Sequence, residues 1–177
     1  RGWITNEQGK AFARRTLEFY LGQNGGPVEG AFGMFYHFLN GNGTPAAGFG
    51  GDGVSLLDST LLFLGAIASG EYFGGDVKAL ATQLFGQADW DAFFDHDTNM
   101  LHLFWTPQGG FVRHLDYTSE GILAYLLALG QPLPMPGDAA PPGMLSKWWS
   151  KLRGAAHSSP SPPSNTSSPS DPSAPST

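Results

Sequence analysis

The sequence predicts an all-α fold followed by a disordered tail. Helix-capping residues stand before apolar stretches, glycines and prolines follow them, and no βαβ unit with a phosphate-binding loop appears. The stretch from Ser158 to Thr177 is almost entirely Ser, Pro, Asn, Thr and Asp. Such a stretch cannot bury enough apolar surface to offset its chain entropy, so we expect it to be disordered.

The first two helices have clear starts. Thr5 followed by Gln8 is a capping-box pattern, which begins the first helix, and Gly22 ends it. Ser55 is expected to cap the second helix, with Asp58 in its first turn, where the helix dipole favours a carboxylate. The second helix is apolar on nearly every side, which is typical of an inner helix packed on both sides.

Two further helices and two irregular segments complete the pattern. Asp76 is expected to cap a third helix over 77–88, and a fourth helix is expected over about 118–129. Residues 33–39, GMFYHFL, form a short apolar run. Residues 98–112 contain β-like pieces around Pro107 and a glycine pair, which indicates a hairpin or an irregular loop. The helix pairs and long loops together favour the all-α class.

Composition excludes several classes of partner. The formal net charge is −6 and the pI is about 5.1, which would repel phosphate backbones, so we expect no nucleic acid partner. Charged residues make up only 14% and aromatic residues 13%, a balance that suits a concave site for a polar ligand. The most apolar stretch, 56–68, is shorter than the roughly 20 residues that span a bilayer, so no membrane insertion is expected.

The chain divides into three parts. Residues 1–134 are expected to form one domain, residues 135–153 a linker with a short helix, and residues 154–177 the disordered Pro/Ser-rich tail. The chain has no cysteine, which leaves the compartment open. Its first five residues are not a signal peptide, and a targeting segment removed before Arg1 remains an alternative.

Four stretches carry a family resemblance when read in order. They are RGWITNEQGKAFARRTLEF, GMFYHFLNG, VSLLDSTLLFLGAIASGEYF and HLFWTPQGGFVRHLDYTSEGILAYLLALGQP. Their order and spacing resemble the glucoamylase-like family of bacterial (α/α) toroids, which includes β-1,2-glucan-cleaving enzymes and domains of cyclic glucan synthases. The resemblance covers Arg1 to about Pro134.

The resemblance implies a partial (α/α) toroid of helical hairpins with long loops. The family domain has a further helix before the first stretch and several helices after the last, so we expect about half of a ring. The implied partner is a glucan or another oligosaccharide, and the implied location is periplasmic or extracellular. No cofactor is implied.

Glycosidic bond cleavage requires two converging carboxyl groups, one to protonate the leaving oxygen and one to activate water or attack the sugar. By resemblance, Asp58 occupies the family's S-t-x-D position and Glu120 its Y-x-E position, which makes them the expected catalytic pair. If the family resemblance is set aside, Asp58 is only a carboxylate that interacts favourably with the helix dipole at the start of a helix. Glu120 would then be a capping-box residue to Tyr117.

Other residues of these stretches are expected to bind the sugar. Asp116 is expected to orient Glu120, two histidines to donate hydrogen bonds to hydroxyls, and aromatic rings to stack on sugar faces. A solvated Asp116 and purely structural histidines are the alternatives. The expected substrate-binding residues are Tyr36, His37, Trp105, His114, Asp116 and Tyr117.

A metal site is not expected. His96 and His102 bracket Asp97, but no regular ligand spacing appears, and the segment 95–97 reads as a solvated turn. Trp90 and Phe93 are expected in the core rather than in a binding site.

Three functions remain open at this point. The leading one is a glycoside hydrolase, or a transferase of a glucan synthase, with linkage and stereochemistry undetermined. Gly53 and Gln108 stand where the family often has acidic residues, which would alter specificity or abolish activity. The second is a non-catalytic remnant that binds saccharide or protein. The third is a truncated fragment with no stable fold of its own, whose exposed faces at Leu61, Leu64 and Leu123 would cause self-association or partial unfolding.

Overall fold

The structure is a computed structural model that describes residues 2–46, 53–116 and 118–130. The expected linker at 135–153 and tail at 154–177 lie outside these ranges. The elements in chain order are α1 (Asn6–Tyr20), β1 (Gly30–Ala31), β2 (Met34–Phe35), β3 (Val54–Ser55), α2 (Leu56–Phe73), α3 (Gly75–Gly86), β4 (Phe94–Asp95), β5 (Met100–Thr106), β6 (Gly110–Leu115) and α4 (Gly121–Gly130).

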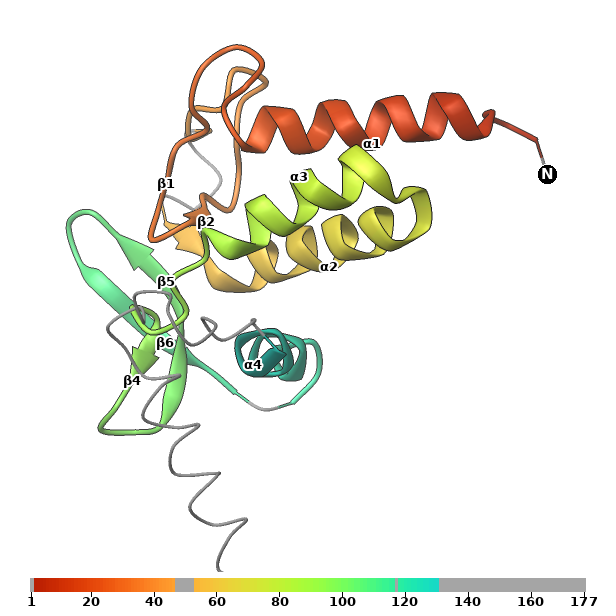
Figure 1. Cartoon of the computed structure of the whole chain (residues 1–177). Helices are drawn as coiled ribbons and strands as arrows, with labels where there is room; N and C mark the ends of the chain where they lie inside the picture. Colours follow the sequence, from red (N-terminus) through yellow and green to blue (C-terminus); the bar gives the residue numbers. More distant parts are fainter. Residues whose placement is uncertain (1, 47–52, 117, 131–177) are drawn as a thin grey trace, which may run out of the picture.

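Three helices form one side of the molecule. α2 and α3 pack along each other, α1 lies along them on the α3 side, and α4 packs on α2 (Figure 1). At Gly70 a Cβ atom would lie only 3.1 Å from both the Cβ of Ala81 and the Cα of Lys78. The absence of a side chain at Gly70 therefore lets α2 and α3 approach closely.

The strands form two small antiparallel sheets. β1 pairs with β2, while the second sheet is centred on β5, which pairs with β3, β4 and β6 (Figure 1). The hairpin of β5 and β6 aligns Leu101 with Leu115 and Trp105 with Phe111. β3 leads directly into α2 at Ser55, so this sheet continues into the start of a helix.

The all-α prediction is wrong, because the fold is mixed, with four helices and six strands in the described part of the chain. Residues 100–106 are rich in apolar and aromatic side chains, and they close a hairpin over the turn at Pro107. Residues 33–36 are too short a run for a helix and pair with other strands instead. Strand pairing of this kind depends on distant partners, which helical periodicity does not reveal.

Local signals at the helix starts are mostly confirmed. Thr5 and Gln8 exchange both hydrogen bonds of a capping box, and the Ser55 side chain accepts from the amide of Asp58. The prediction for Asp76 is wrong, since Gly74 precedes α3 and makes no side-chain cap. Asp76 instead pairs with Lys10 of α1 at 3.1 Å, which links α3 to α1.

The core lies between α2, α3 and the large sheet. Trp90 and Phe93 are almost fully buried, as predicted, and Phe63 of α2 contacts the ring of Trp90 with centroids 6.1 Å apart. A fully buried side chain of this size is worth about 1.5–3 kcal/mol. This core fixes the start of α2 relative to β5.

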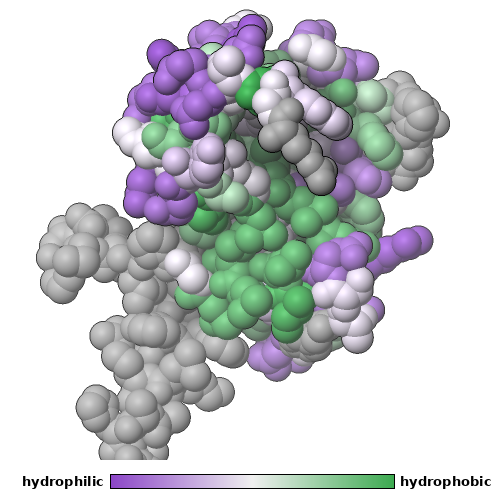
Figure 2. All heavy atoms as spheres, turned by 90° about the vertical axis from the view of Figure 1, so that its right-hand side faces the viewer, coloured by the Kyte–Doolittle hydropathy of each residue, from purple (hydrophilic) through white to green (hydrophobic). Residues whose placement is uncertain are grey.

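A broad apolar face is visible when the molecule is turned (Figure 2). α2 and α4 contribute exposed apolar side chains, of which Leu61 is 47% and Leu126 57% accessible. Leu64 and Leu123 are half-buried rather than exposed. A search of the described residues finds no helix long and apolar enough to cross a membrane.

Candidate functional site

Asp58 lies in the first turn of α2, with its carboxylate held in place by Ser55. The Ser55 side chain accepts a hydrogen bond from the Asp58 amide at 3.3 Å, and its hydroxyl donates to Asp58 Oδ2. The side chain of Asp58 remains 43% accessible. A carboxylate at this position is both fixed by a hydroxyl and favoured by the positive end of the helix dipole.

His37 is the second functional side chain at this place. Its Nε2 lies 3.5 Å from Asp58 Oδ2, and its side chain is 31% accessible. Its amide donates to the carbonyl of Gly53 at 3.1 Å. His37 and Asp58 were predicted separately, 21 residues apart in the sequence, and the fold brings them together. We call His37, Ser55 and Asp58 the α2 cluster.

Three strand segments frame the α2 cluster. Tyr36 forms an antiparallel bridge with Val54, and Val54 pairs in turn with Trp105 of β5. Phe104 lies beside His37, with ring centroids 5.9 Å apart. Two predicted sugar-binding residues, Tyr36 and Trp105, therefore belong to segments that adjoin the α2 cluster.

Ser59 supports this arrangement and was not identified from the sequence. Its buried hydroxyl accepts from the amide of Phe35 at 2.9 Å and donates to the carbonyl of Ser55 at 2.7 Å. It thereby fixes the segment before His37 against the helix that carries Asp58. The only sequence signal was a hydroxyl one position after an acidic residue, which is common in helices.

Trp105 makes contacts with aromatic side chains of another loop. Its ring meets Phe32 edge-on, with centroids 5.5 Å apart, and Phe111 is its cross-strand partner. Trp105 is half-buried, while Phe32 is 39% accessible. Trp105 follows Phe104, which lies beside His37, and successive side chains of a strand point to opposite faces of the sheet, so the ring of Trp105 lies on the other face from His37.

Glu120 lies immediately before α4. Its Oε2 accepts a hydrogen bond from the Ser119 hydroxyl at 2.7 Å, and the side chain is exposed. A Cβ on Gly121 would lie 2.3 Å from the carbonyl oxygen of Asp116, so the start of α4 rests on the end of β6. Asp116 Oδ1 accepts from the amide and hydroxyl of Thr118, which shapes this turn. Tyr117 lies outside the described residues.

His114 lies in a different place, on β6, and contacts Asp95 rather than Asp58. Its Nε2 is 2.7 Å from Asp95 Oδ2. His102 is its direct cross-strand partner on β5, and the two imidazole rings stack with centroids 4.9 Å apart. We call Asp95, His102 and His114 the hairpin cluster. It combines residues that the sequence analysis had assigned to a solvated turn and to sugar binding.

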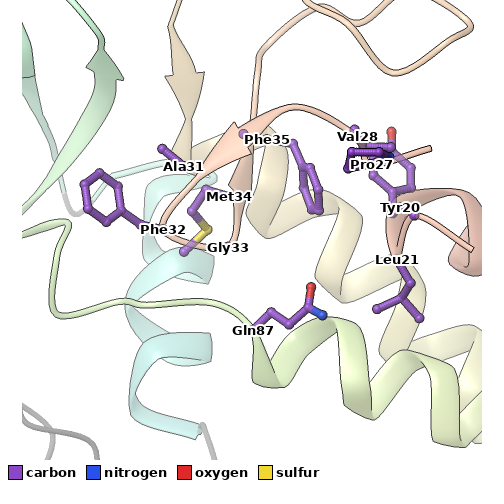
Figure 3. A pocket seen from close by; sticks show the side chains of 12 residues that line it. Tyr20, Leu21, Pro27, Val28, Ala31, Phe32, Gly33, Met34, Phe35 and Gln87 are labelled. Carbon is purple, nitrogen blue, oxygen red and sulfur yellow. The ribbon is translucent and has the colours of Figure 1, made fainter.

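A pocket of about 270 Å³ has no residue of either cluster in its lining, and Figure 3 shows the side chains that form it. It is formed by the end of α1, the β1–β2 turn and Gln87, with Tyr20, Met34 and Phe35 among its lining residues. Burial raises the pKa of Tyr20 above its ordinary value. The pocket contains no carboxylate or imidazole, so it offers no acid or base for hydrolysis.

The fold of this chain is similar to that of a solved structure. No protein-family model and no curated protein matches the chain. The chain is similar to a putative glucoamylase from Bacteroides caccae ATCC 43185, with a TM-score of 0.61 and 26% sequence identity. The match covers 75% of this chain and 33% of the Bacteroides chain, so this chain spans about a third of that protein.

This match agrees with the four sequence stretches that begin at Arg1 and end near Pro134. It supports a glycoside-hydrolase-like fold, although the described residues form a mixed α/β arrangement rather than the expected ring of helices. The resemblance to the glucoamylase-like family is therefore confirmed by the structure, in which this chain is similar to about a third of the Bacteroides chain.

Proposed function

We propose that the chain is carbohydrate-active and contributes to the cleavage or transfer of glycosidic bonds, with Asp58 and Glu120 as the reacting carboxyl groups. The observation that carries this proposal is the α2 cluster: an accessible carboxylate held by the Ser55 hydroxyl and adjacent to His37. It occurs in a chain that has part of the fold of a protein described as a glucoamylase.

The surroundings of Asp58 hold its carboxylate in place and leave it accessible. A hydroxyl donates to it, an imidazole nitrogen lies 3.5 Å away, and the side chain is 43% accessible. A fixed and accessible carboxylate suits the general base of an inverting mechanism or the nucleophile of a retaining one. We therefore assign this role to Asp58, and the role of general acid to Glu120.

The two acids stand at the starts of helices that pack together, α2 and α4. Ser55, at the start of α2, is opposite Phe104 of β5, whereas Leu115, before the turn to α4, is opposite Leu101. These two positions on β5 are three residues apart, or about 10 Å. Carboxyl groups act together over roughly 5–10 Å, so a joint role requires the side chains of Asp58 and Glu120 to converge from these two helix starts.

Sugar binding would use the residues that frame Asp58. Pyranose rings stack on aromatic faces while their hydroxyls pair with polar side chains. His37 provides a polar group next to the carboxylate of Asp58, and Tyr36 and Trp105 provide aromatic rings on the adjoining strand segments. Asp116, Tyr117 and His114 complete the proposed binding residues, although the structure gives His114 a carboxylate partner of its own.

The test compares hydrolysis and binding in the full chain. Wild-type protein, Asp58→Asn and Glu120→Gln are incubated with β-1,2-linked and α-1,4-linked glucans, and released reducing ends are measured. Each substitution removes charge and keeps shape, so a loss of about 100-fold or more is expected with an unchanged circular dichroism spectrum. Glu71→Gln is the matched control, because Glu71 is an exposed acid of α2 that pairs with Lys78.

A second function is binding of saccharide without turnover. It is favoured by the aromatic rings of Phe32 and Trp105, which offer apolar surface to a sugar ring without requiring a reacting pair of carboxyl groups. In this case both variants retain binding measured by calorimetry, and no reducing ends appear with any glucan. Failure of wild-type protein both to bind and to cleave glucans would contradict both functions.

A further inference from the structure

The hairpin cluster has the composition and spacing of a metal site. One ring nitrogen from each of His102 and His114 and one carboxylate oxygen of Asp95 all lie within 4.8 Å of one another. The residues come from three neighbouring strands, β4, β5 and β6. Each strand thus supplies one side chain with a potential ligand atom.

Strand pairing explains why the side chains converge. The His102 amide donates to the carbonyl of Phe93, on the β4 side of β5. His102 and His114 therefore face each other across β5 and β6 without mutual backbone hydrogen bonds, the arrangement in which cross-strand side chains lie closest. Asp95 pairs with Met100 at the neighbouring position, which brings its carboxylate to the same end of the sheet.

The carboxylate of Asp95 is fixed before any ion binds. Its Oδ1 accepts from the amides of Asp97 and Thr98, at 2.9 and 3.3 Å. Its Oδ2 accepts from the Thr98 hydroxyl at 2.8 Å and lies 2.7 Å from His114 Nε2. A carboxylate oriented by neighbouring donors is the usual second-shell arrangement at metal sites.

The ring of His102 supports a metal site independently of the distances between the three side chains. Its Nδ1 is buried and has no hydrogen-bond partner, although buried polar atoms are almost always paired. The imidazole is stacked between Phe111 and His114, at 5.0 and 4.9 Å between centroids.

We propose that Asp95, His102 and His114 bind a divalent transition-metal ion of the zinc class. Two imidazoles and one carboxylate are a typical zinc ligand set, whereas magnesium and calcium prefer oxygen ligands alone. Three ligands of a tetrahedral zinc ion stand about 3.4 Å apart, given metal–ligand distances near 2.1 Å. The present separations, from 2.7 Å to at most 4.8 Å, bracket this value.

Three protein ligands leave at least one position open to water or to a ligand. His114 is exposed, and Asp95 and His102 are partly accessible, so this position faces solvent. The ion would join β4 to the β5–β6 hairpin. The proposal departs from the sequence analysis, which expected no metal and gave His114 a role in sugar binding. It does not rest on the roles proposed for Asp58 and Glu120.

The test measures metal binding by the full chain without an affinity tag. The protein is treated with a chelator, dialysed and titrated with ZnCl₂ by calorimetry, with MgCl₂ as a second titrant. One equivalent of zinc should bind with a dissociation constant in the micromolar range or below, and magnesium should not bind. Asp95→Asn and His114→Gln should each weaken zinc binding by about tenfold or more.

The matched control is His96→Gln. His96 is an exposed histidine of the same turn that lies 3.4 Å from Asp91, outside the hairpin cluster. This variant should bind zinc as wild type does. Equal zinc affinity in wild-type protein, Asp95→Asn and His114→Gln would overturn the proposal, as would absence of binding by wild-type protein.

A second measurement does not depend on the variants folding. Long-range ¹H–¹⁵N spectra of wild-type protein record the ring nitrogens of all five histidines. Zinc should shift one ring nitrogen each of His102 and His114 and leave those of His37 and His96 unchanged. Shifts confined to His96 or His37, or no shifts at saturating zinc, would also overturn the proposal.

Discussion

The α2 cluster and the hairpin cluster use the same two chemical groups in different settings. In the α2 cluster, Asp58 stands at a helix start and accepts from one hydroxyl, with His37 3.5 Å away. In the hairpin cluster, Asp95 accepts from two backbone amides and a hydroxyl, and its histidine is 2.7 Å away. Asp58 is 43% accessible and Asp95 only 19%.

This difference indicates what each cluster is suited for. A carboxylate that is accessible and has one fixed donor retains lone pairs for water or a sugar hydroxyl. A carboxylate with most of its lone pairs engaged, beside two imidazoles, is held in a fixed position as a metal ligand is. The same pair of residue types therefore supports acid–base chemistry in one region and ion binding in the other.

The largest expected effect is on glucan cleavage, and it distinguishes the function of the α2 cluster from that of the hairpin cluster. Asp58→Asn should lower glucan cleavage by about 100-fold or more, because the carboxylate charge is lost. It should leave the zinc titration unchanged, since no contact joins Asp58 to the hairpin cluster. Wild-type turnover by the chain alone is itself expected to be slow, below the usual 1–1000 per second or so, so product is measured after long incubation. Equal rates for wild-type protein and Asp58→Asn would remove Asp58 from the chemistry.

The next largest expected effect is on the free energy of unfolding, through hydroxyl groups that hold the segments of each cluster together. Ser59→Ala removes a buried hydroxyl that joins Phe35 to Ser55, and should cost about 1–3 kcal/mol of unfolding free energy. Tyr125→Phe removes the hydroxyl that accepts from Leu101 and donates to Leu115, at a similar cost. Denaturant titration measures both changes.

The two variants should differ in which region loosens. Hydrogen exchange should increase near His37 in Ser59→Ala, and in β5 and β6 in Tyr125→Phe. The comparison fails if both variants loosen the same amides, because the clusters would then form one cooperative unit.

A moderate effect is expected from the apolar face of Figure 2. Leu61 and Leu126 are about half exposed on helices that otherwise pack into the core, which favours contact with another apolar surface. We predict that the chain self-associates in a concentration-dependent manner, measured by light scattering. Leu126→Glu should shift the population towards monomer. A strictly monomeric wild-type chain at all concentrations would contradict this prediction.

The smallest expected effect concerns an ion pair outside both clusters. It serves as a reference for the measurements made on the two clusters. The Arg14 guanidinium, 2.7 Å from Glu18, and the Asn24 amide hold the pKa of Glu18 below its ordinary value. The folded form therefore gains stability from Glu18 above the unfolded pKa and loses it as the pH falls through the folded pKa. Arg14→Ala should raise the pKa of Glu18 in a carbon NMR titration, with no change at either cluster. An unchanged pKa would show that the pair is not formed in solution.

The sequence predicted the α2 cluster better than the hairpin cluster for a physical reason. Ser55 and Asp58 are three residues apart and act through the geometry of one helix, so their pattern is visible locally. His37 could be predicted only from its place beside an aromatic loop, and its distance to Asp58 depends on the bridge between Tyr36 and Val54. The buried contact of Ser59 with Phe35 spans 24 residues and has no local signature.

The hairpin cluster depends on register, which periodicity does not reveal. His102 and His114 meet because β5 and β6 align them, and Asp95 joins them through a third strand. The same dependence explains the wrong fold class, since helix starts are marked by local residues while short strands are fixed by their partners. The expected place of Glu120 beside Asp58 stays a prediction.

The central claim is that a saccharide binds where Asp58 and Glu120 stand. The most direct measurement is a titration of ¹⁵N-labelled chain with a gluco-oligosaccharide, monitored through its backbone amides. We expect shifts that cluster at residues 36–37, 53–58 and 118–121, and that weaken in Asp58→Asn. No shifts at any oligosaccharide concentration, or shifts confined to the pocket around Tyr20 and Met34, would contradict it.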